Sequence, residues 1–307
     1  MPNQEILNEI LAEIYNEIKL IQNNGKVANY IPELAKIDCN KFGMSIHTSD
    51  NQTYSIGDAQ EKFSIQSISK VFSLTMAIMA IGKSLWNRID VEPSGDAFNS
   101  LTLLEFENGK PRNPFINSGA IVVADVIMSH YTNPKEAFLD FVQKLSCNPT
   151  ISYNSAVVHS EKMHSYRNLA LASLMKSFGN IKNNIEEVLD LYIHFCSVEM
   201  SCEDLAKAFL LFANHGKDDQ GNEIITPSRT KRINAIMQTC GFYDQSGEFA
   251  FEVGLPGKSG VGGGIVAVHP NKYSVAVWSP KLNPKGNSVL GMAALEKLTT
   301  KLNLSIF

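Results

Sequence analysis

The sequence predicts an α+β fold, with a mainly antiparallel sheet flanked by N- and C-terminal helices plus a helical lobe. Residues 44–56 and 263–279 each contain two alternating or β-branched runs around a turn, which is typical of hairpins. The middle of the chain, residues 101–216, has helical spacing of its apolar residues. We therefore expect residues 1–100 and 225–307 to form a sheet lobe, residues 101–224 a helical lobe, and the active site to lie between them.

The first elements in chain order are a helix, a hairpin and a second helix. Isoleucine recurs every four residues from Ile6 to Ile18, which predicts an amphipathic helix ending near Gly25. The first hairpin has residues 44–47 and 53–56 as its strands, with a turn between them. The apolar residues 63–81 predict the next helix.

The remaining elements are helices and a second hairpin. Ser201 and Asp204 have the spacing of a capping box, with Asp in place of Glu. Residues 263–269 and 273–279 predict the second hairpin, and residues 291–302 a closing helix. The predicted helices of the middle are residues 120–130, 134–145, 167–178, 185–195 and 201–214.

Composition limits the partners and the cellular compartment that we expect for this protein. The chain has 307 residues, 44% of them hydrophobic, and a net charge of −4, so we expect no nucleic acid and no membrane as partner. Its five cysteines form no C-x-x-C pair, which indicates reduced thiols in the cytoplasm. Residues 1–22 do not resemble a signal peptide, and we expect the apolar run 71–81 to be too short to span a bilayer.

The most informative motif is Ser67-Ile68-Ser69-Lys70 at the start of an apolar helix. Serine and lysine three residues apart share one helix face, as a serine nucleophile and its lysine base require. Lys70 can accept a proton only when it is neutral, and burial lowers the pKa of a lysine. Lys258, in a distant K-S-G segment, would line the other wall and act on Lys70 in the same direction. The backbone N–H groups of Ser67 and Val261 would form an oxyanion hole.

Simpler interpretations of these residues exist. A lone S-x-x-K occurs by chance, with Ser67 as a helix cap and Lys70 as a solvated side chain. Lys258 could be an exposed loop charge. Apolar residues follow Lys70, so its helix belongs to the core, which favours the functional interpretation.

Longer motifs resemble those of the serine-dependent glutaminases, in their compact bacterial form. The nucleophile segment is residues 63–72, and the resemblance runs from about residue 14 to about residue 302. It implies a β-lactamase/transpeptidase-like fold, hydrolysis of L-glutamine to L-glutamate and ammonia, no cofactor, and a homodimer or homotetramer. The other matching segments are residues 25–35, 92–95, 98–100, 111–117, 160–161, 166–172, 192–199, 241–250 and 254–261.

The resemblance also implies roles for individual residues. Ser67 matches the nucleophile, Lys70 the base, and Val261 the oxyanion-hole amide, with Lys258 in support. One of two site tyrosines, Tyr192 or Tyr243, would pass a proton to the departing ammonia. The implied substrate-binding residues are Tyr30, Ser67, Asn117, Glu161, which would hold the α-amino group, Asn168, Tyr192, Tyr243 and Val261.

Structural alternatives remain open for several of these residues. The two tyrosines could be packing residues, and Glu161 could form a solvated pair with Lys162. Asn117 and Asn168 could be helix caps. Arg167 is interpreted as structural.

Other functions and sites are weighed against this one. The seven histidines show no metal-ligand spacing, so we predict no metal. Ser49-Asp50-Asn51 matches a triplet of the β-lactamase group, but it precedes the nucleophile, so we interpret it as a turn. A β-lactam or peptide hydrolase on the same fold is the competing enzyme, and a catalytically silent amino-acid-binding protein is the competing non-enzyme.

Overall fold

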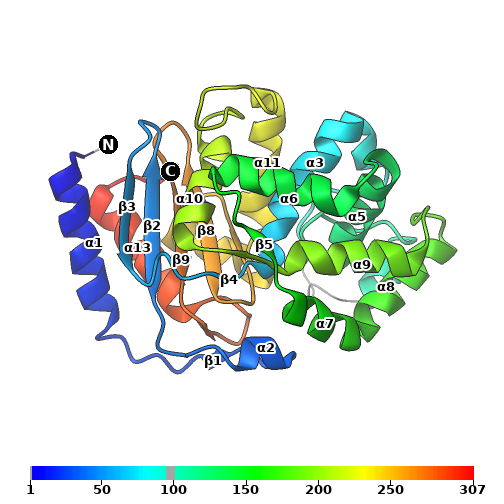
Figure 1. The fold of residues 1–307 in the computed structure, drawn as a ribbon, viewed down its shortest axis with the longest axis horizontal. Helices are drawn as coiled ribbons and strands as arrows, with labels where there is room; N and C mark the ends of the chain where they lie inside the picture. Colours follow the sequence, from blue (N-terminus) through cyan, green and yellow to red (C-terminus); the bar gives the residue numbers. More distant parts are fainter. Residues whose placement is uncertain (1, 95–100) are drawn as a thin grey trace.

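The computed structural model describes residues 2–94 and 101–307. Residues 95 and 98–100, which belong to two of the matching segments, lie outside the described residues. The fold is α+β, as predicted, and consists of a five-stranded antiparallel sheet and a group of helices beside it (Figure 1).

The central sheet contains both predicted hairpins. Its strands run in the order β3-β2-β9-β8-β7, and every neighbouring pair is antiparallel. A turn at residues 49–51 joins β2 to β3, as predicted. The strands are β2 (Gly43–Thr48), β3 (Thr53–Gly57), β7 (Gly257–Ser259), β8 (Gly264–His269) and β9 (Tyr273–Trp278).

Both faces of this sheet are covered. The terminal helices α1 (Gln4–Ile18) and α13 (Val289–Leu302) lie on one face, and α10 (Cys202–Ala213) lies on the other (Figure 1). On β9, Val275 and Val277 belong to the core under the terminal helices, whereas Ala276 and Trp278 belong to the core on the opposite side. This two-sided burial explains why the strand reads as a continuous apolar run.

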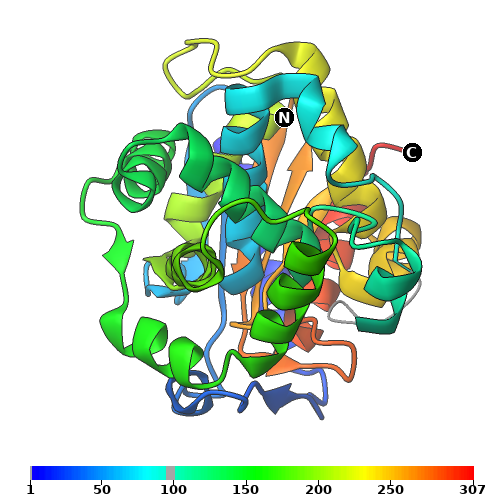
Figure 2. The same cartoon turned by 90° about the vertical axis from the view of Figure 1, so that its right-hand side faces the viewer.

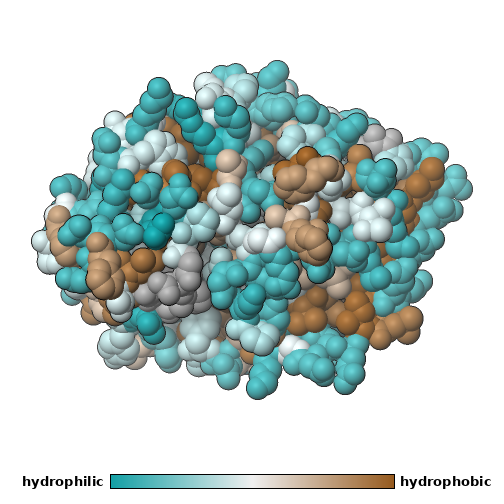
Figure 3. Space-filling model, turned by 180° about the vertical axis from the view of Figure 1, so that it is seen from behind, coloured by the Kyte–Doolittle hydropathy of each residue, from teal (hydrophilic) through white to brown (hydrophobic). Residues whose placement is uncertain are grey.

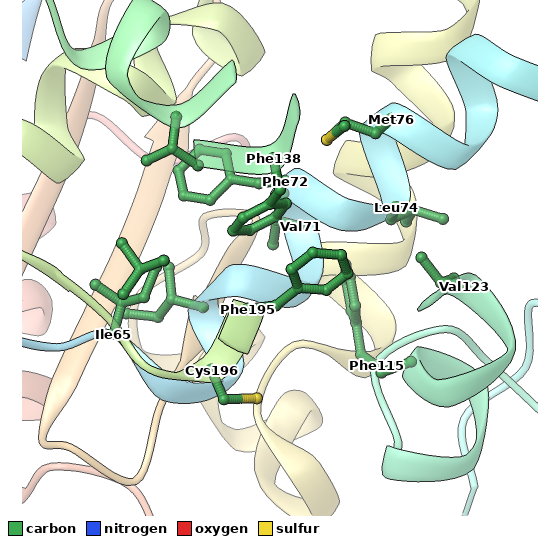
Figure 4. Close-up of a cluster of buried hydrophobic side chains, with 14 of the residues drawn as sticks. Ile65, Val71, Phe72, Leu74, Met76, Phe115, Val123, Phe138, Phe195 and Cys196 are labelled. Carbon is green, nitrogen blue, oxygen red and sulfur yellow. The ribbon is translucent and has the colours of Figure 1, made fainter. Parts of the chain in front are cut away.

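The five predicted helices of the middle are present, and Ser201 and Asp204 form the predicted capping box. Helix α5 is central and packs against α3, α8 and α9. Phe72, Phe115 and Phe195 are buried where these elements meet (Figure 4). The five are α5 (Asn117–His130), α6 (Pro134–Ser146), α8 (Tyr166–Ser177), α9 (Ile185–Cys196) and α10, and helix α3 spans Ser69–Ile81.

The division into two lobes stays a prediction, and two helices pack across its boundaries. Helix α3 falls in the range predicted for the sheet lobe, yet it packs against α5. Helix α10 falls in the helical range, yet it covers the sheet. Both are apolar on most sides, so each can bury surface against two layers at once.

Several elements were not predicted. The most consequential is α11 (Pro227–Cys240), of whose 14 residues only five are buried, so its apolar stripe is weak. The first helix ends at Ile18, earlier than predicted, because residues 26–27 pair with residues 281–282. The other elements are α2 (Pro32–Ala35), α4 (Leu101–Phe106), α7 (Ser155–Met163), α12 (Ser246–Glu252), η3 (Tyr243–Gln245), β1 (Lys26–Val27), β5 (Ser152–Tyr153) and β10 (Lys281–Leu282).

The predicted helix over residues 63–81 is wrong at its start. Residues 63–64 form strand β4 (Phe63–Ser64), which pairs with β6 (Val198–Met200) after α9. A 3-10 turn, η1 (Gln66–Ile68), comes next, and α3 begins at Ser69. Gln66 has a φ of 48°, the left-handed region that few side chains occupy. The chain therefore turns sharply between a strand and a helix at Ser67.

The apolar run 71–81 belongs to a longer helical stretch than expected. With η1 and η2 (Gly82–Asn87), α3 forms 22 helical residues, Gln66–Asn87, that are long and apolar enough to cross a membrane by length and composition. Within the most apolar 18-residue window of this stretch, 67% is buried inside the protein. A helix buried in a protein core also meets this criterion of length and composition. The face seen from behind is mainly hydrophilic, with apolar residues in separate patches (Figure 3).

Candidate active site

A cavity of ≈ 320 Å³ lies beside the strained turn that carries Ser67. Eight of the ten predicted site residues line it, and they come from segments far apart in the sequence. The eight are Tyr30, Ser67, Asn117, Glu161, Asn168, Tyr192, Tyr243 and Val261. Lys70 and Lys258 do not line the cavity because both are fully buried behind its wall.

Lys70 is 1% exposed, which excludes the interpretation as a solvated side chain. Its Nζ donates to Asn117 Oδ1 at 2.7 Å and to Phe115 O at 3.1 Å. Burial lowers the pKa of this amine to about 8, because the charged form has lost its water. A charge on Cys196 would act in the opposite direction, but burial raises the pKa of that thiol to about 11. The thiol is therefore neutral at physiological pH.

The expected contact between Lys70 and Ser67 is not formed in this arrangement. Within residues 2–94 and 101–307, both hydrogen bonds of the amine go to the segment around the start of α5. Catalytic hydrogen bonds are often long or misaligned before substrate binds. Ser67 and Lys70 lie three residues apart in one helical stretch, so their side chains share a face.

Lys258 is 0% exposed, which excludes the interpretation as a loop charge. Its Nζ donates to Ser259 O at 2.6 Å and lies 4.8 Å from the centroid of the Tyr243 ring. Burial, followed by the charge of Lys70, holds the pKa of Lys258 well below its ordinary value. The main cause of the lowered pKa is thus burial for both lysines, rather than repulsion between them.

The two predicted site tyrosines are buried and differ in their contacts. Tyr243 follows α11 and has a φ of 56°, in the left-handed region. Burial raises its pKa to about 12, against the opposing effect of hydrogen bonding with Ser67 and Ser259. The Tyr192 hydroxyl donates to Asn117 Oδ1 at 3.3 Å, and burial raises its pKa well above the ordinary value. Both phenols are therefore protonated at neutral pH and able to donate.

The carboxylate of Glu161 lines another part of the cavity wall. The Tyr30 hydroxyl donates to Glu161 Oε1 at 2.7 Å and lies 3.1 Å from Gln66 Oε1. Burial raises the pKa of Glu161, while hydrogen bonds from Tyr30 and Gln66 lower it. Lys162 pairs with Asp190 instead, so Glu161 is not half of a solvated pair with its neighbour.

The two asparagines belong to one hydrogen-bond network with Lys70. Asn117 Oδ1 accepts from Lys70 and Tyr192, and its Nδ2 donates to Asn168 Oδ1 at 3.1 Å. Neither contact is a helix cap. Asn117 therefore connects the buried amine to the cavity surface.

The turn between β7 and β8 lies directly against the Ser67 backbone. A Cβ on Gly260 would lie 2.6 Å from Ile65 O and 3.4 Å from Ser67 N, and one on Gly262 would lie 2.3 Å from Ser64 O. Only glycine permits this approach. Ser67 is the second residue of η1, so its N–H is among the donors that a helix start leaves unpaired. Val261 lies between the two glycines, which places it opposite Ser67 on the cavity wall.

Five further lining residues were not selected from the sequence: Gln66, His164, Arg167, Ile193 and Cys196. Helical periodicity relates Cys196 to Tyr192, one turn earlier on α9, and would have found it. Gln66 directly precedes Ser67, the predicted nucleophile. Arg167 was interpreted as structural, but it lies at the rim beside Asn168.

Comparison with known proteins places the chain in a family. The glutaminase family model matches residues 25–307. A glutaminase of Christiangramia forsetii is 56% identical over 97% of this chain and 99% of its own length, and one of Saccharophagus degradans is 57% identical over 97% and 98%.

Solved structures agree over the whole fold. The probable glutaminase YbaS superposes with a TM-score of 0.94 at 32% identity, covering 100% of this chain and 99% of that one. A probable glutaminase of Bacillus subtilis gives a TM-score of 0.87 at 31% identity, covering 98% and 96%. On these matches in sequence and structure, the chain belongs to the glutaminase family.

Proposed function

We propose that this protein hydrolyses L-glutamine to L-glutamate and ammonia through a γ-glutamyl ester on Ser67. Membership of the glutaminase family supports the reaction. The observation that carries the mechanism is the convergence, around one cavity, of a serine hydroxyl on a strained turn and a carboxylate, Glu161, with a buried lysine of lowered pKa behind the wall.

The cavity suits a free amino acid. Its volume of ≈ 320 Å³ is at the small end of ligand pockets. Glu161 would hold the α-ammonium group, and the hydroxyl of Tyr30 keeps that carboxylate in place. Asn117 and Asn168 would contact the rest of the head group, which leaves the side-chain amide to reach Ser67.

The first half of the cycle forms the ester. Neutral Lys70 takes the proton of the Ser67 hydroxyl, and Oγ attacks the amide carbon. The resulting oxyanion accepts hydrogen bonds from the N–H groups of Ser67 and Val261, each worth roughly 3–4 kcal/mol of barrier. Because the pKa of Lys70 is about 8, roughly a tenth of the amines are neutral at pH 7.

The second half releases the products. Tyr243 gives its proton to the amide nitrogen and recovers one from protonated Lys70, and the C–N bond breaks to release ammonia. Water then attacks the ester while Lys70 takes its proton. Ser67 regains its proton as the C–O bond breaks, and glutamate leaves. Tyr243 is assigned this step, rather than Tyr192, because Ser67 is among the groups that act on the pKa of its phenol, whereas the Tyr192 hydroxyl donates to Asn117.

Purified Ser67→Ala and Lys70→Met variants test this mechanism in a coupled glutamate assay. We expect each to lose more than about a thousandfold in turnover. Ser73→Ala is the matched control, since Ser73 is another buried serine, lies on α3, and among the described residues its hydroxyl donates to the Lys70 carbonyl. Rapid denaturation of the working enzyme should trap a glutamyl group on the peptide that contains Ser67. Normal glutamate release by Ser67→Ala would refute the ester.

The competing functions have distinct outcomes in parallel assays. Hydrolysis of nitrocefin without turnover of glutamine would identify a β-lactam hydrolase. Tight binding of glutamine by calorimetry, with no glutamate formed, would identify a binding protein. Turnover of asparagine at a similar rate would show that the cavity does not discriminate between substrates by the length of their side chains.

We further propose a cytoplasmic homodimer or homotetramer. All five cysteines are free thiols, as a reducing compartment favours. The oligomeric state follows from the resemblance to glutaminases. Sedimentation velocity at several protein concentrations tests the assembly, and a purely monomeric boundary would refute it; cell fractionation tests the compartment.

A further inference from the structure

His164 lies on the wall of the catalytic cavity and takes no part in the ester mechanism. It directly follows α7, and its backbone N–H donates to Glu161 O at 3.2 Å. Figure 2 shows α7 and α8 in green, joined near the bottom of the molecule, with α2 in blue beneath α7. The exposed side chain of His164 comes from the junction of α7 with α8, where Arg167 and Asn168 continue the wall. The imidazole therefore shares the rim of the cavity with the carboxylate that would hold the α-ammonium group.

One hydrogen bond decides which ring nitrogen of His164 is available to a bound molecule. Nδ1 lies 2.8 Å from Ser160 O, and a carbonyl oxygen only accepts, so Nδ1 carries a proton. Nε2 makes no hydrogen bond with another described residue. In the neutral imidazole Nε2 is then an acceptor, and in the charged imidazole it is a donor. The available nitrogen therefore changes its role with pH.

His164 and Glu161 lie close enough to act on each other electrostatically. Burial, the largest effect, raises the pKa of Glu161, whereas a charge on His164 lowers it. An imidazolium therefore partly neutralises the carboxylate that would attract the cationic end of the substrate. It also repels an ammonium group placed beside that carboxylate. The two protonation states of His164 thus have opposite effects on a bound amino acid.

We propose that neutral His164 is a second acceptor for the α-ammonium group of glutamine, beside Glu161. This inference rests on the proposed function, because it requires glutamine in the cavity. An ammonium group has three N–H donors, and Glu161 Oε1 already accepts from Tyr30. The ring nitrogen supplies a further acceptor on the same rim. Protonation removes that acceptor and puts a cation in its place, so the affinity for glutamine falls at low pH.

Other charged groups surround His164, and their effects on binding must be separated from its own. Glu161 has a raised pKa, so it loses its charge at a higher pH than an ordinary glutamate as the solution is acidified. Every such group is the same in the wild type and in a variant of His164 alone. The difference between the two proteins therefore isolates the imidazole. The charged and titratable groups on α7 and on the segments around it are Tyr30, Glu33 of α2, Lys162, Arg167 of α8, and Asp190 and His194 of α9.

Calorimetric titration of L-glutamine into Ser67→Ala protein measures affinity without turnover. A histidine of ordinary pKa is about nine-tenths protonated at pH 5.5. If only the neutral form binds, the Kd should rise about tenfold between pH 7.5 and pH 5.5, in addition to the rise that Glu161 causes. Adding His164→Gln should remove this tenfold part, because glutamine at this position offers an uncharged acceptor in place of Nε2. Adding His164→Leu should raise the Kd at pH 7.5 by about fivefold or more, since a hydrogen bond to a charged group is lost.

His159→Gln is the matched control. His159 is exposed on the same helix, two residues from Glu161, but it does not line the cavity. This variant should keep the pH dependence of the Ser67→Ala protein. In the enzyme with Ser67 intact, His164→Leu should raise KM at pH 7.5 and leave kcat within about twofold, which a general loss of structure would not do. Circular dichroism establishes that each variant is folded.

The outcomes distinguish a failure of this inference from a failure of the proposed function. An equal change in Kd between the two pH values, with and without His164→Gln, would overturn the role of His164. Tighter binding at pH 5.5 that His164→Gln removes would also overturn it, because the imidazolium would then hold the α-carboxylate. Glutamine still binds in both cases, so the proposed function stands. Absence of glutamine binding and of turnover at pH 7.5 would overturn the proposed function and this inference together.

Discussion

The buried amine of Lys70 should make the stability of this protein depend on pH in a way that Lys70→Met removes. Burial lowers its pKa from 10.5 to about 8 in the folded chain. At about 1.4 kcal/mol for each pKa unit, the protonated amine is roughly 3 kcal/mol less favourable in the fold than in water. Between these two pKa values the unfolded chain binds more protons than the folded one, so stability rises with pH.

The size of the effect follows from the two pKa values. Between pH 7 and pH 9.5, linkage gives a gain of about 2 kcal/mol in the free energy of unfolding of the wild type relative to Lys70→Met. The variant itself should be less stable at pH 9.5, because Phe115 O and Asn117 Oδ1 lose their donor. Burial, the main cause of the lowered pKa of Lys258, is common to both proteins, so Lys258 enters the difference only through its repulsion by Lys70.

Urea unfolding at pH 7.0, 8.3 and 9.5 measures this difference. Lys231→Met, at an exposed position, controls for the loss of one positive charge from the chain. If the free-energy difference between wild type and Lys70→Met is the same at all three pH values, the amine is not held with a lowered pKa. The argument for Lys70 as a neutral base would then fail together with the stability argument.

Three further outcomes follow from the same geometry. The kcat/KM for glutamine should rise with pH through about 8, as Lys70 loses its proton. Initial rates from pH 6 to 10 measure this rise, and a pH-independent kcat/KM would contradict the role of Lys70. Asn117→Asp places a carboxylate where an amide oxygen now lies 2.7 Å from the Lys70 amine, so the rise in kcat/KM should move to higher pH by about one unit or more. An unchanged midpoint of this pH profile would exclude the contact between Asn117 and Lys70. Gly260→Ala puts a methyl group 2.6 Å from Ile65 O and should lower kcat/KM by about tenfold or more. The control Gly247→Ala, with open space around its Cβ, should leave kcat/KM unchanged. Equal kcat/KM of the two variants in steady-state assays would show that the turn between β7 and β8 does not position Ser67.

The hairpins were predictable because their pattern is local. Residues 44–56 and 263–279 alternate or run apolar around a turn, and strands with one or two buried faces carry that signal whatever they pack against. The capping box at Ser201 is equally local. Helix α11 was not predictable, since only five of its residues are buried and the rest of its surface is polar. The start of the helix over residues 63–81 was misjudged because β4 depends on a partner strand more than 130 residues away.

In the candidate site, too, local features were predictable from the sequence and contacts between remote segments were not. The S-x-x-K motif and the K-S-G segment are readable as chemistry from the residues alone. The partner of Glu161 was not readable, because Tyr30 comes from a segment 131 residues earlier. Gln66 lines the cavity without any local signal of function, and its strain appears only when the strand before it is paired. Cys196 was open to prediction only through its helical spacing from Tyr192.

The sequence by itself determined the order and type of most elements, the reactive residue types and their spacing, because these depend on near neighbours along the chain. Only the tertiary structure decided how deeply Lys70 and Lys258 are buried, which acceptors the Lys70 amine meets, and which residues share the cavity. The physical reason is that desolvation, and with it the pKa of an amine, is set by everything packed around the group. Most of what surrounds Lys70 comes from parts of the chain that are remote in sequence.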